Sequence, residues 1–185
     1  MAVRLGFFFI HINKTGGSSI EQALGYYFGH RTASEKIADL GKAAWKKLFS
    51  FAIVRNPWDR VVSHFHYRAM TNQSELGAKA IGFNEWVKLA YGENVPEYYD
   101  KPKMFMPQWH WLIDEKGRPA VSFIGRFENL QDDFAKICML LNREAELPHL
   151  KKSDRGNYRQ YYSTASIEIV ERWFQDDIEK FGYKF

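Results

Sequence analysis

The chain has 185 residues, of which 45% are hydrophobic and 17% aromatic, and its formal net charge is +4. We expect residues 1–185 to form a single domain, because a chain of this length can bury a core of its own. The charge suits an anionic ligand but is too small and too dispersed to indicate a nucleic-acid-binding protein. The single cysteine, Cys138, excludes an intrachain disulfide and a cysteine-rich metal site.

An apolar run lies near the N-terminus. It is about eight residues long, too short to span a bilayer, and no small-residue cleavage site follows it. We therefore expect a protein without a transmembrane segment that works in the cytoplasm, unless the sequence was excised from a longer, membrane-anchored chain.

Predicted strands and helices alternate in the first part of the chain. Residues 5–12 are almost continuously apolar, which is typical of a strand covered on both faces. Apolar residues at helical spacing predict a helix over residues 17–28. Thr32 or Ser34 can cap a second helix that runs toward Leu40.

A second strand and helix follow. Residues 50–54 form another buried apolar run. Asn56 is a good helix N-cap and Pro57 a good first helical residue, so a helix begins there. The polar residues 69–79 predict a loop, and residues 83–91 predict a short amphipathic helix.

The rest of the chain mixes loops and helices. Glycine and proline make residues 92–107 an irregular segment that could line a substrate groove. Residues 109–113 and 120–124 flank a polar turn, which predicts either a hairpin or a loop with an extended return. Helices are expected over residues 128–141 and 166–181. The alternation as a whole predicts an α/β fold with a central parallel sheet of about four strands, flanked by helices.

The first candidate site is the turn at residues 14–19, Lys-Thr-Gly-Gly-Ser-Ser, between the first strand and the first helix. A strand, a glycine turn and a helix point backbone N–H groups at one spot, which binds anions. Gly16 and Gly17 let an oxyanion approach the backbone, and Lys14 adds a positive charge. The hydroxyl donors of the turn are Thr15, Ser18 and Ser19. The alternative is an ordinary glycine-rich connection.

The second candidate site follows the second strand. Arg55 stands at the strand end and Ser63 about two turns into the next helix, so the two could hold a second phosphate. Alternatively, Arg55 pairs with Asp59 and Ser63 is an exposed helix residue. Ligands of parallel sheets collect at the carboxyl ends of the strands, where both candidate sites lie. A ligand with two separated anionic groups accounts for both.

The first turn is not a nucleotide triphosphatase loop. In that loop the lysine follows the glycines, whereas here Lys14 precedes Gly16 and Gly17. The sequence also shows no apolar strand ending in an aspartate that could bind magnesium.

The order Lys-Thr-Gly-Gly-Ser-Ser, then Arg-Asn-Pro-x-x-Arg-x-x-Ser, resembles the sulfotransferases that use 3′-phosphoadenosine 5′-phosphosulfate. The carbohydrate branch, with its heparan 2-O-, chondroitin and HNK-1-like enzymes, is the most similar. The resemblance implies a three-layer, P-loop-like α/β fold and covers nearly the whole chain. Asn13 stands where proline is more usual. Four motifs carry the resemblance: residues 11–19, 51–63, 124–130 and 177–183.

The resemblance also implies roles for the site residues, without a metal. Lys14 would contact the bridging oxygen and stabilise charge on the departing phosphate. The turn would hold the 5′-phosphate and sulfuryl oxygens, while Arg55 and Ser63 would hold the 3′-phosphate. A basic loop at residues 151–156 would close over the nucleotide, or be merely a solvated loop. The implied donor-binding residues are Lys14, Thr15, Gly16, Gly17, Ser18, Ser19, Arg55, Ser63, Arg155 and Gly156.

Sulfuryl transfer to a hydroxyl also needs a base, and histidine is the natural choice near neutral pH. We choose His30, in the break after the first helix, because members of the carbohydrate branch carry a base histidine in this interval. His11 is expected to pack beside the strand end. His64 or His66 could instead line the acceptor cleft, and Glu35 is a carboxylate alternative to His30.

The predicted activity is sulfuryl transfer from 3′-phosphoadenosine 5′-phosphosulfate, which leaves adenosine 3′,5′-bisphosphate, to a hydroxyl of a saccharide or glycan-like acceptor. The alternatives are a nucleotide or small-molecule kinase with an atypical phosphate loop and a non-catalytic phosphate- or glycan-binding module. The middle of the chain is rich in aromatic residues, most of which we expect in the core and some stacked on sugar rings. They are Trp86, Tyr91, Tyr98, Tyr99, Phe105, Trp109 and Trp111.

Overall fold

The computed structural model describes residues 6–79, 81–148 and 156–185. The chain divides into two compact units. Unit 1 comprises residues 1–55 and 108–151, and unit 2 comprises residues 56–107 and 152–185. Along the described ranges, no helix combines the length and the apolar character that a bilayer crossing needs.

Unit 1 contains the sheet. Its strands are β1 (Phe7–Ile10), β2 (Phe49–Val54) and β3 (Phe123–Arg126), and both neighbouring pairs run parallel in the order β1-β2-β3. The predicted α/β fold with a parallel sheet is therefore confirmed. The expectation of about four strands is wrong for the described residues, which form a sheet of three.

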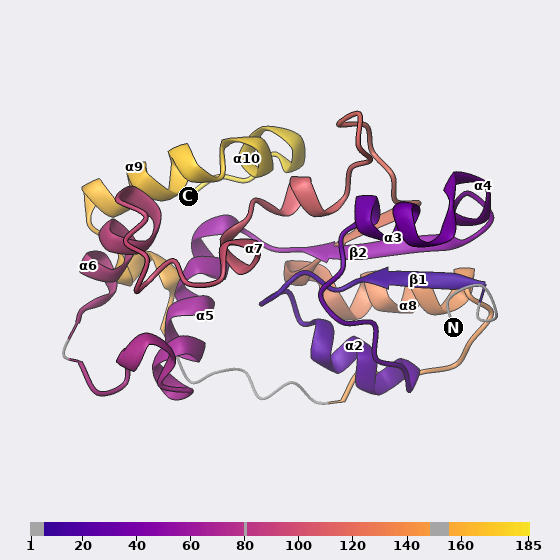
Figure 1. Cartoon of the computed structure of the whole chain (residues 1–185). Helices are drawn as coiled ribbons and strands as arrows, with labels where there is room; N and C mark the ends of the chain where they lie inside the picture. The colour runs from indigo at the N-terminus through magenta and orange to yellow at the C-terminus, as the bar shows by residue number, and fades with distance from the viewer. Residues whose placement is uncertain (1–5, 80, 149–155) are drawn as a thin grey trace. The chain divides into compact units, whose positions relative to one another are not determined.

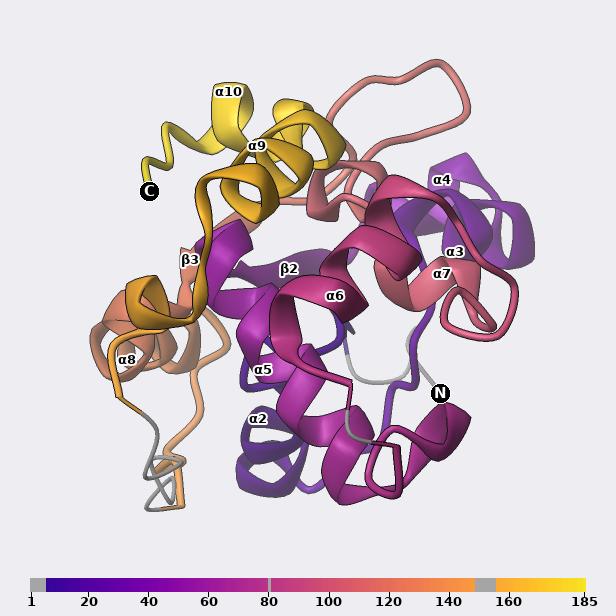
Figure 2. The same ribbon diagram turned by 90° about the vertical axis from the view of Figure 1, so that its left-hand side faces the viewer.

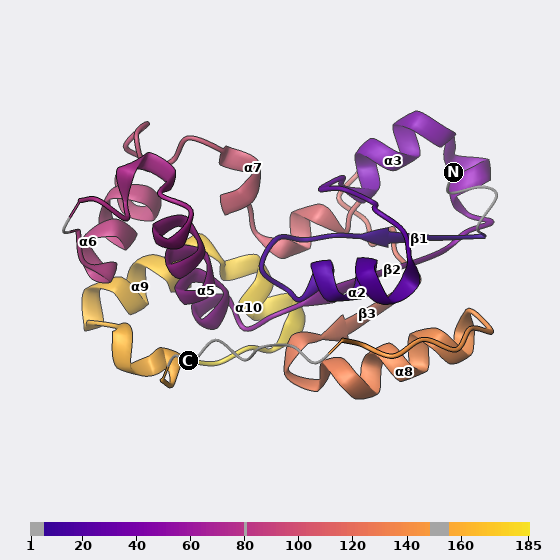
Figure 3. The same ribbon diagram turned by 90° about the horizontal axis from the view of Figure 1, so that it is seen from below.

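Helices cover both faces of this sheet. Figure 1 shows α3 and α4 on one side and α2 and α8 on the other, and Figure 3 gives the same arrangement from below. Phe9, Phe51 and Phe134 belong to the core between the sheet and α2 and α8. On the opposite face Phe8 packs against Trp45, with 5.9 Å between ring centroids. The helices are α2 (Gly17–Leu24), α3 (Ala33–Leu40), α4 (Lys42–Trp45) and α8 (Leu130–Leu140).

Local sequence signals explain where two of these helices begin or end. The Thr32 hydroxyl accepts from the Glu35 N–H at 3.1 Å, and the Glu35 carboxylate accepts from the Thr32 N–H at 2.8 Å. Thr32, rather than Ser34, is thus the N-cap of α3. The helix expected over residues 17–28 ends earlier, because Gly25 adopts a left-handed φ of 73° and closes α2.

The segment before β3 is a loop with an extended return and not a hairpin. Residues Gln108–Trp111 form a 3-10 turn, η3. An isolated antiparallel bridge between Ile113 and Pro119 then joins the two sides of the loop, with one backbone hydrogen bond on each side of it. Asp114 closes the loop by accepting from the N–H and the guanidinium of Arg118. These bonds lower the pKa of Asp114 to about 2.

Unit 2 is helical in its described part, and Figure 2 looks onto α5, α6 and α9. Asn56 and Pro57 start α5 as predicted, with the Asn56 side chain accepting from the N–H groups of Trp58 and Asp59. The terminal helix expected over residues 166–181 is two helices that meet at Phe174. The elements are α5 (Pro57–Met70), η1 (Gln73–Glu75), α6 (Phe83–Val87), η2 (Lys88–Gly92), α7 (Pro102–Phe105), η5 (Tyr158–Tyr161), α9 (Thr164–Trp173) and α10 (Gln175–Phe181).

Aromatic side chains form much of the core of unit 2. Trp86, Tyr91 and Phe105 are buried, and their ring centroids lie 5.2–6.2 Å apart. Burial raises the pKa of Tyr91. The buried Arg60 donates to the carbonyls of Met104 and Met106, both at 3.2 Å. The expectation that most of the aromatic residues are core residues is confirmed.

Replacing Thr32 by alanine removes the hydroxyl that caps α3. We expect the free energy of unfolding to fall by about 1 kcal/mol, because an N–H of the first turn loses its acceptor. Urea denaturation followed by circular dichroism measures this loss. Thr32→Ser keeps the hydroxyl and is the control, so equal losses in the two variants would contradict the capping role.

Candidate functional site

The turn between β1 and α2 has the backbone geometry that suits an anion. Lys14 has a left-handed φ of 65° and Gly16, the N-cap of α2, a φ of 84°. Gly16 has no side chain to accept from the first turn of the helix, and that turn carries no acidic residue. The N–H groups at a helix start lack partners within the helix, and the helix dipole adds positive potential there.

The three hydroxyl residues of the turn have different surroundings. Thr15 is fully buried, and its Oγ1 donates to the Ile12 carbonyl at 2.9 Å. Ser18 is exposed and Ser19 is half-buried, both in the first turn of α2. The Thr15 hydroxyl therefore shapes the turn, and Ser18 and Ser19 are better placed to donate to a ligand.

Packing requires both glycines of the turn. A Cβ on Gly17 would lie 2.1 Å from Cδ2 of His11. A Cβ on Gly16 would lie 2.9 Å from Cδ2 of Leu130, and the φ of Gly16 is also unfavourable for other residues. The backbone of the turn is thus held close to the side chains beneath it.

Arg55 joins the second motif to the first. Its Nη1 donates to the Lys14 carbonyl at 3.0 Å, and its guanidinium lies 3.9 Å from the ring centroid of Phe127. The Gln108 amide accepts from the Arg55 N–H at 2.9 Å and donates to the Arg55 carbonyl at 2.8 Å. Arg55 is buried, so it supports the backbone of the turn at the residue that carries the candidate catalytic charge.

His30 lies beside the end of β1. Its Nδ1 donates to the His11 carbonyl at 2.8 Å, and the centroids of the two imidazoles are 4.4 Å apart. The rings of His30 and Trp111 form a T-shaped pair with 6.2 Å between their centroids. His30 is half-buried. The structure therefore places the candidate base next to the residue that packs on Gly17.

His11 is buried beside the strand end, as predicted. Its ring stacks on Phe9 with 5.5 Å between centroids, and its Nδ1 lies 3.1 Å from Oε1 of Glu21. Burial lowers the pKa of His11, Glu21 opposes this effect and His30 adds to it. His11 is accordingly neutral near pH 7.

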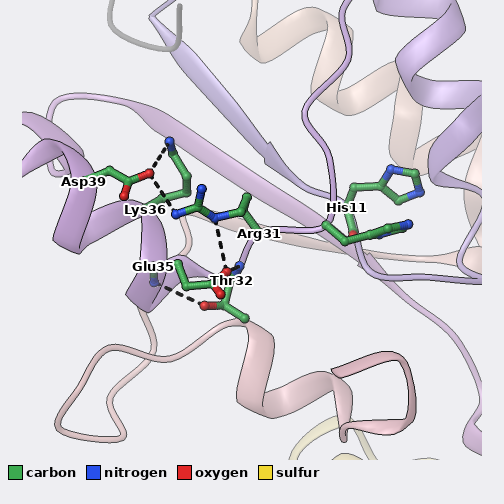
Figure 4. Close-up of polar contacts among 7 residues, drawn as sticks. His11, Arg31, Thr32, Glu35, Lys36 and Asp39 are labelled. Atoms are coloured by element: carbon green, nitrogen blue, oxygen red, sulfur yellow. Dashed lines mark hydrogen bonds and ion pairs between the residues drawn. The ribbon is translucent and has the colours of Figure 1, made fainter. Parts of the chain in front are cut away.

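Glu35, the alternative base, takes part in a polar network at the start of α3 (Figure 4). Besides capping the helix, its carboxylate lies 3.4 Å from Nε of Arg31. Arg31 and Lys36 both donate to Asp39, at 2.9 and 3.0 Å. The hydrogen bonds from Lys36 and Arg31 lower the pKa of Asp39. These contacts give Glu35 a structural role in α3.

The remaining candidates belong to unit 2 or to undescribed residues. Ser63 is half-buried on α5, and Gly156 is exposed ahead of η5. Arg155 lies outside the described residues, as does most of the basic loop. Nδ1 of the buried His64 lies 3.4 Å from the Tyr91 hydroxyl, whereas His66 is exposed. Within the described ranges, no group of His, Cys, Asp and Glu side chains is arranged to hold a metal ion.

Sequence reasoning missed three residues that support the site: Glu21, Gln108 and Phe127. Phe127 lies within residues 124–130, one of the four motifs on which the family resemblance rests, so the sequence did mark its position. Glu21 lies beside the buried Ile20 in α2, but an isolated helical glutamate indicates nothing by itself. Gln108 gives no signal in the sequence.

The chain is similar to known proteins in sequence and in structure. The model of the sulfotransferase family matches residues 1–184. A sulfotransferase from Alicyclobacillus acidocaldarius has a similar structure, with a TM-score of 0.52, 13% identity and coverage of 97% of this chain and 96% of that chain. At this identity the likeness shows the fold alone. An uncharacterized protein from Archaeoglobus fulgidus is 29% identical over an alignment of 121 residues that covers 62% of this chain and 89% of that protein.

Replacing Gly17 by alanine puts a Cβ into the ring of His11. We expect the free energy of unfolding to fall by about 1–3 kcal/mol, because the buried ring must move. In Gly17→Ala/His11→Ala the clash is absent, so the double variant should be more stable than the sum of the single losses predicts. Denaturant titration of the four proteins measures both effects. Additive losses would contradict the proposed packing.

Proposed function

Because this chain belongs to the sulfotransferase family, we propose that it transfers a sulfuryl group from 3′-phosphoadenosine 5′-phosphosulfate to a hydroxyl of a saccharide or glycan-like acceptor. The observation that carries this proposal is the anion-binding corner at Gly16 with His30 in the same cluster of contacts. The family match extends over both units, which supports the further proposal that residues 1–185 act as one sulfotransferase domain.

The residues of the turn fit the 5′ end of this donor. The start of α2 offers backbone N–H groups and no carboxylate in its first turn. Lys14 brings a positive charge to the same turn. Arg55 binds the Lys14 carbonyl and so supports this turn. In our proposal Arg55 and Ser63 hold the 3′-phosphate.

The donor supplies an activated sulfuryl group and a nucleotide leaving group. The protein has to align the acceptor oxygen with the sulfur–oxygen bond that breaks and to stabilise the charge that develops. We assign Lys14 to the charge on the departing phosphate oxygen. His30 accepts the hydroxyl proton of the acceptor as the new sulfur–oxygen bond forms. These steps need no metal ion.

The saccharide class of the acceptor rests on the resemblance to the carbohydrate branch. A base for a sugar hydroxyl has to act near neutral pH, which suits an imidazole. A kinase remains the competing enzyme class, and the lysine-before-glycine order of the turn weighs against it.

Replacing Lys14 by alanine removes the charge from the turn. We expect the affinity for adenosine 3′,5′-bisphosphate to fall about ten- to hundredfold, because a charge-assisted bond to phosphate is lost. Transfer from radiolabelled donor should collapse as well. Calorimetric titration measures the affinity, and Lys47→Ala, at an exposed lysine of the same unit, is the control. An unchanged affinity in Lys14→Ala would refute the assignment of the turn.

Replacing His30 by alanine removes the proposed base and leaves the turn intact. We expect kcat to fall about 10²–10⁴-fold, because the hydroxyl proton no longer has a positioned acceptor. The affinity for adenosine 3′,5′-bisphosphate should stay within about twofold of the wild type, since histidine is not among the groups that hold phosphate here. Wild-type turnover in His30→Ala would remove His30 from the mechanism. His110→Ala, at an exposed histidine, is the matched control.

A further inference from the structure

Glu21 has a buried carboxylate that the proposed reaction does not use. Its side chain is only 10% exposed, on α2. Its Oε1 accepts from the N–H of Phe28 at 2.8 Å and from the N–H of Gly29 at 3.3 Å. The same oxygen lies 3.1 Å from Nδ1 of His11. One carboxylate oxygen therefore contacts three nitrogen atoms from two separate stretches of chain.

The first stretch leads directly into His30. Gly29 has a left-handed φ of 67°, which glycine adopts without strain, so the chain turns directly before His30. The two N–H groups that Glu21 binds belong to this turn. Hydrogen bonds to an ionised carboxylate are about twice as strong as neutral ones, so they fix where the turn lies.

The second stretch holds the partner of His30. The His11 carbonyl accepts from Nδ1 of His30, and the His11 ring is the group that Glu21 contacts. Glu21 thus binds the turn that precedes His30 and lies against the ring of His11, on the two sides of the hydrogen bond between His30 and His11. The two imidazoles lie 4.4 Å apart, and burial lowers the pKa of His11.

This hydrogen bond decides which nitrogen of His30 can act. A carbonyl oxygen only accepts, so the bond requires the proton on Nδ1 of His30. In the neutral ring Nε2 then has the free lone pair, because the hydrogen bond of one ring nitrogen sets the state of the other.

We infer that Glu21 is the positioning residue for His30: by holding the Phe28–Gly29 turn and His11, it fixes His30 as the tautomer whose Nε2 can accept a proton. The consequence for turnover rests on the proposed function, in which His30 is the base. The consequence for the tautomer does not.

The test combines a spectroscopic and a kinetic measurement. Long-range proton–nitrogen correlation NMR identifies the tautomer of each histidine, with His30→Ala assigning the His30 signals. In the wild type we expect neutral His30 to carry its proton on Nδ1. Glu21→Ala should show a mixture of tautomers. It should also lower kcat by about 10- to 100-fold while the donor KM stays within about twofold.

Glu21→Gln is the conservative variant, because its amide oxygen can accept from the same two N–H groups. It should keep the Nδ1–H tautomer and recover most of the lost kcat. If Glu21→Ala does not fold, Glu21→Gln replaces it as the test variant. The neutral amide oxygen forms weaker hydrogen bonds than the carboxylate, so we expect kcat to fall about two- to fivefold. Gln22→Ala, at the exposed neighbour in α2, is the control and should match the wild type.

The outcomes separate this inference from the proposed function. An Nε2–H tautomer in the wild type overturns the inference. An unchanged tautomer together with an unchanged kcat in Glu21→Ala also overturns it. If the alanine variant does not fold, an unchanged kcat in Glu21→Gln overturns it. A changed tautomer in Glu21→Ala, in a protein whose wild type transfers no sulfuryl group, supports the positioning role and refutes the proposed function.

Discussion

The packing of the His11 ring against Gly17 is the contact on which the candidate site depends. No side chain fits at Gly17, because a Cβ there would lie 2.1 Å from the ring. His11 is buried directly after β1, and its carbonyl accepts from His30. The start of α2 and the candidate base are therefore both built onto one buried residue. A change at His11 should disturb the anion-binding corner and the base together.

A second constraint ties the two sequence motifs to each other. Arg55 comes from the end of β2, yet it binds the backbone of the turn that follows β1. Gln108 fixes the backbone of Arg55, and Phe127 covers its guanidinium. Three parallel strands end near one another, so the residues that follow β1, β2 and β3 can contribute to one site. This arrangement explains how a short sheet can hold an anion-binding turn in a fixed geometry.

Much of the fold could be predicted because its signals are local. The apolar runs predicted β1 and β2, and Asn56 with Pro57 predicted the start of α5. Errors arose where a single residue or distant packing decided the outcome. Gly25 ends α2 early through its left-handed conformation. Phe174 is fully buried where the expected terminal helix divides, a contact that helical periodicity does not reveal.

The same distinction applies to the site. The glycine turn, Lys14 and Arg55 could be proposed as site residues because their residue types and order suit phosphate binding. Glu21 and Gln108 could not, because their roles come from hydrogen bonds to residues distant in sequence or in another loop. The tautomer of His30 likewise depends on a carbonyl 19 residues away.

The most direct test of the account is a calorimetric titration of the wild-type protein with adenosine 3′,5′-bisphosphate and, separately, with ATP and magnesium. An anion-binding corner that serves a sulfotransferase should bind the bisphosphate tightly and without added metal, and should bind ATP with magnesium much more weakly. Tighter binding of ATP with magnesium, and none of the bisphosphate, would contradict the proposed function.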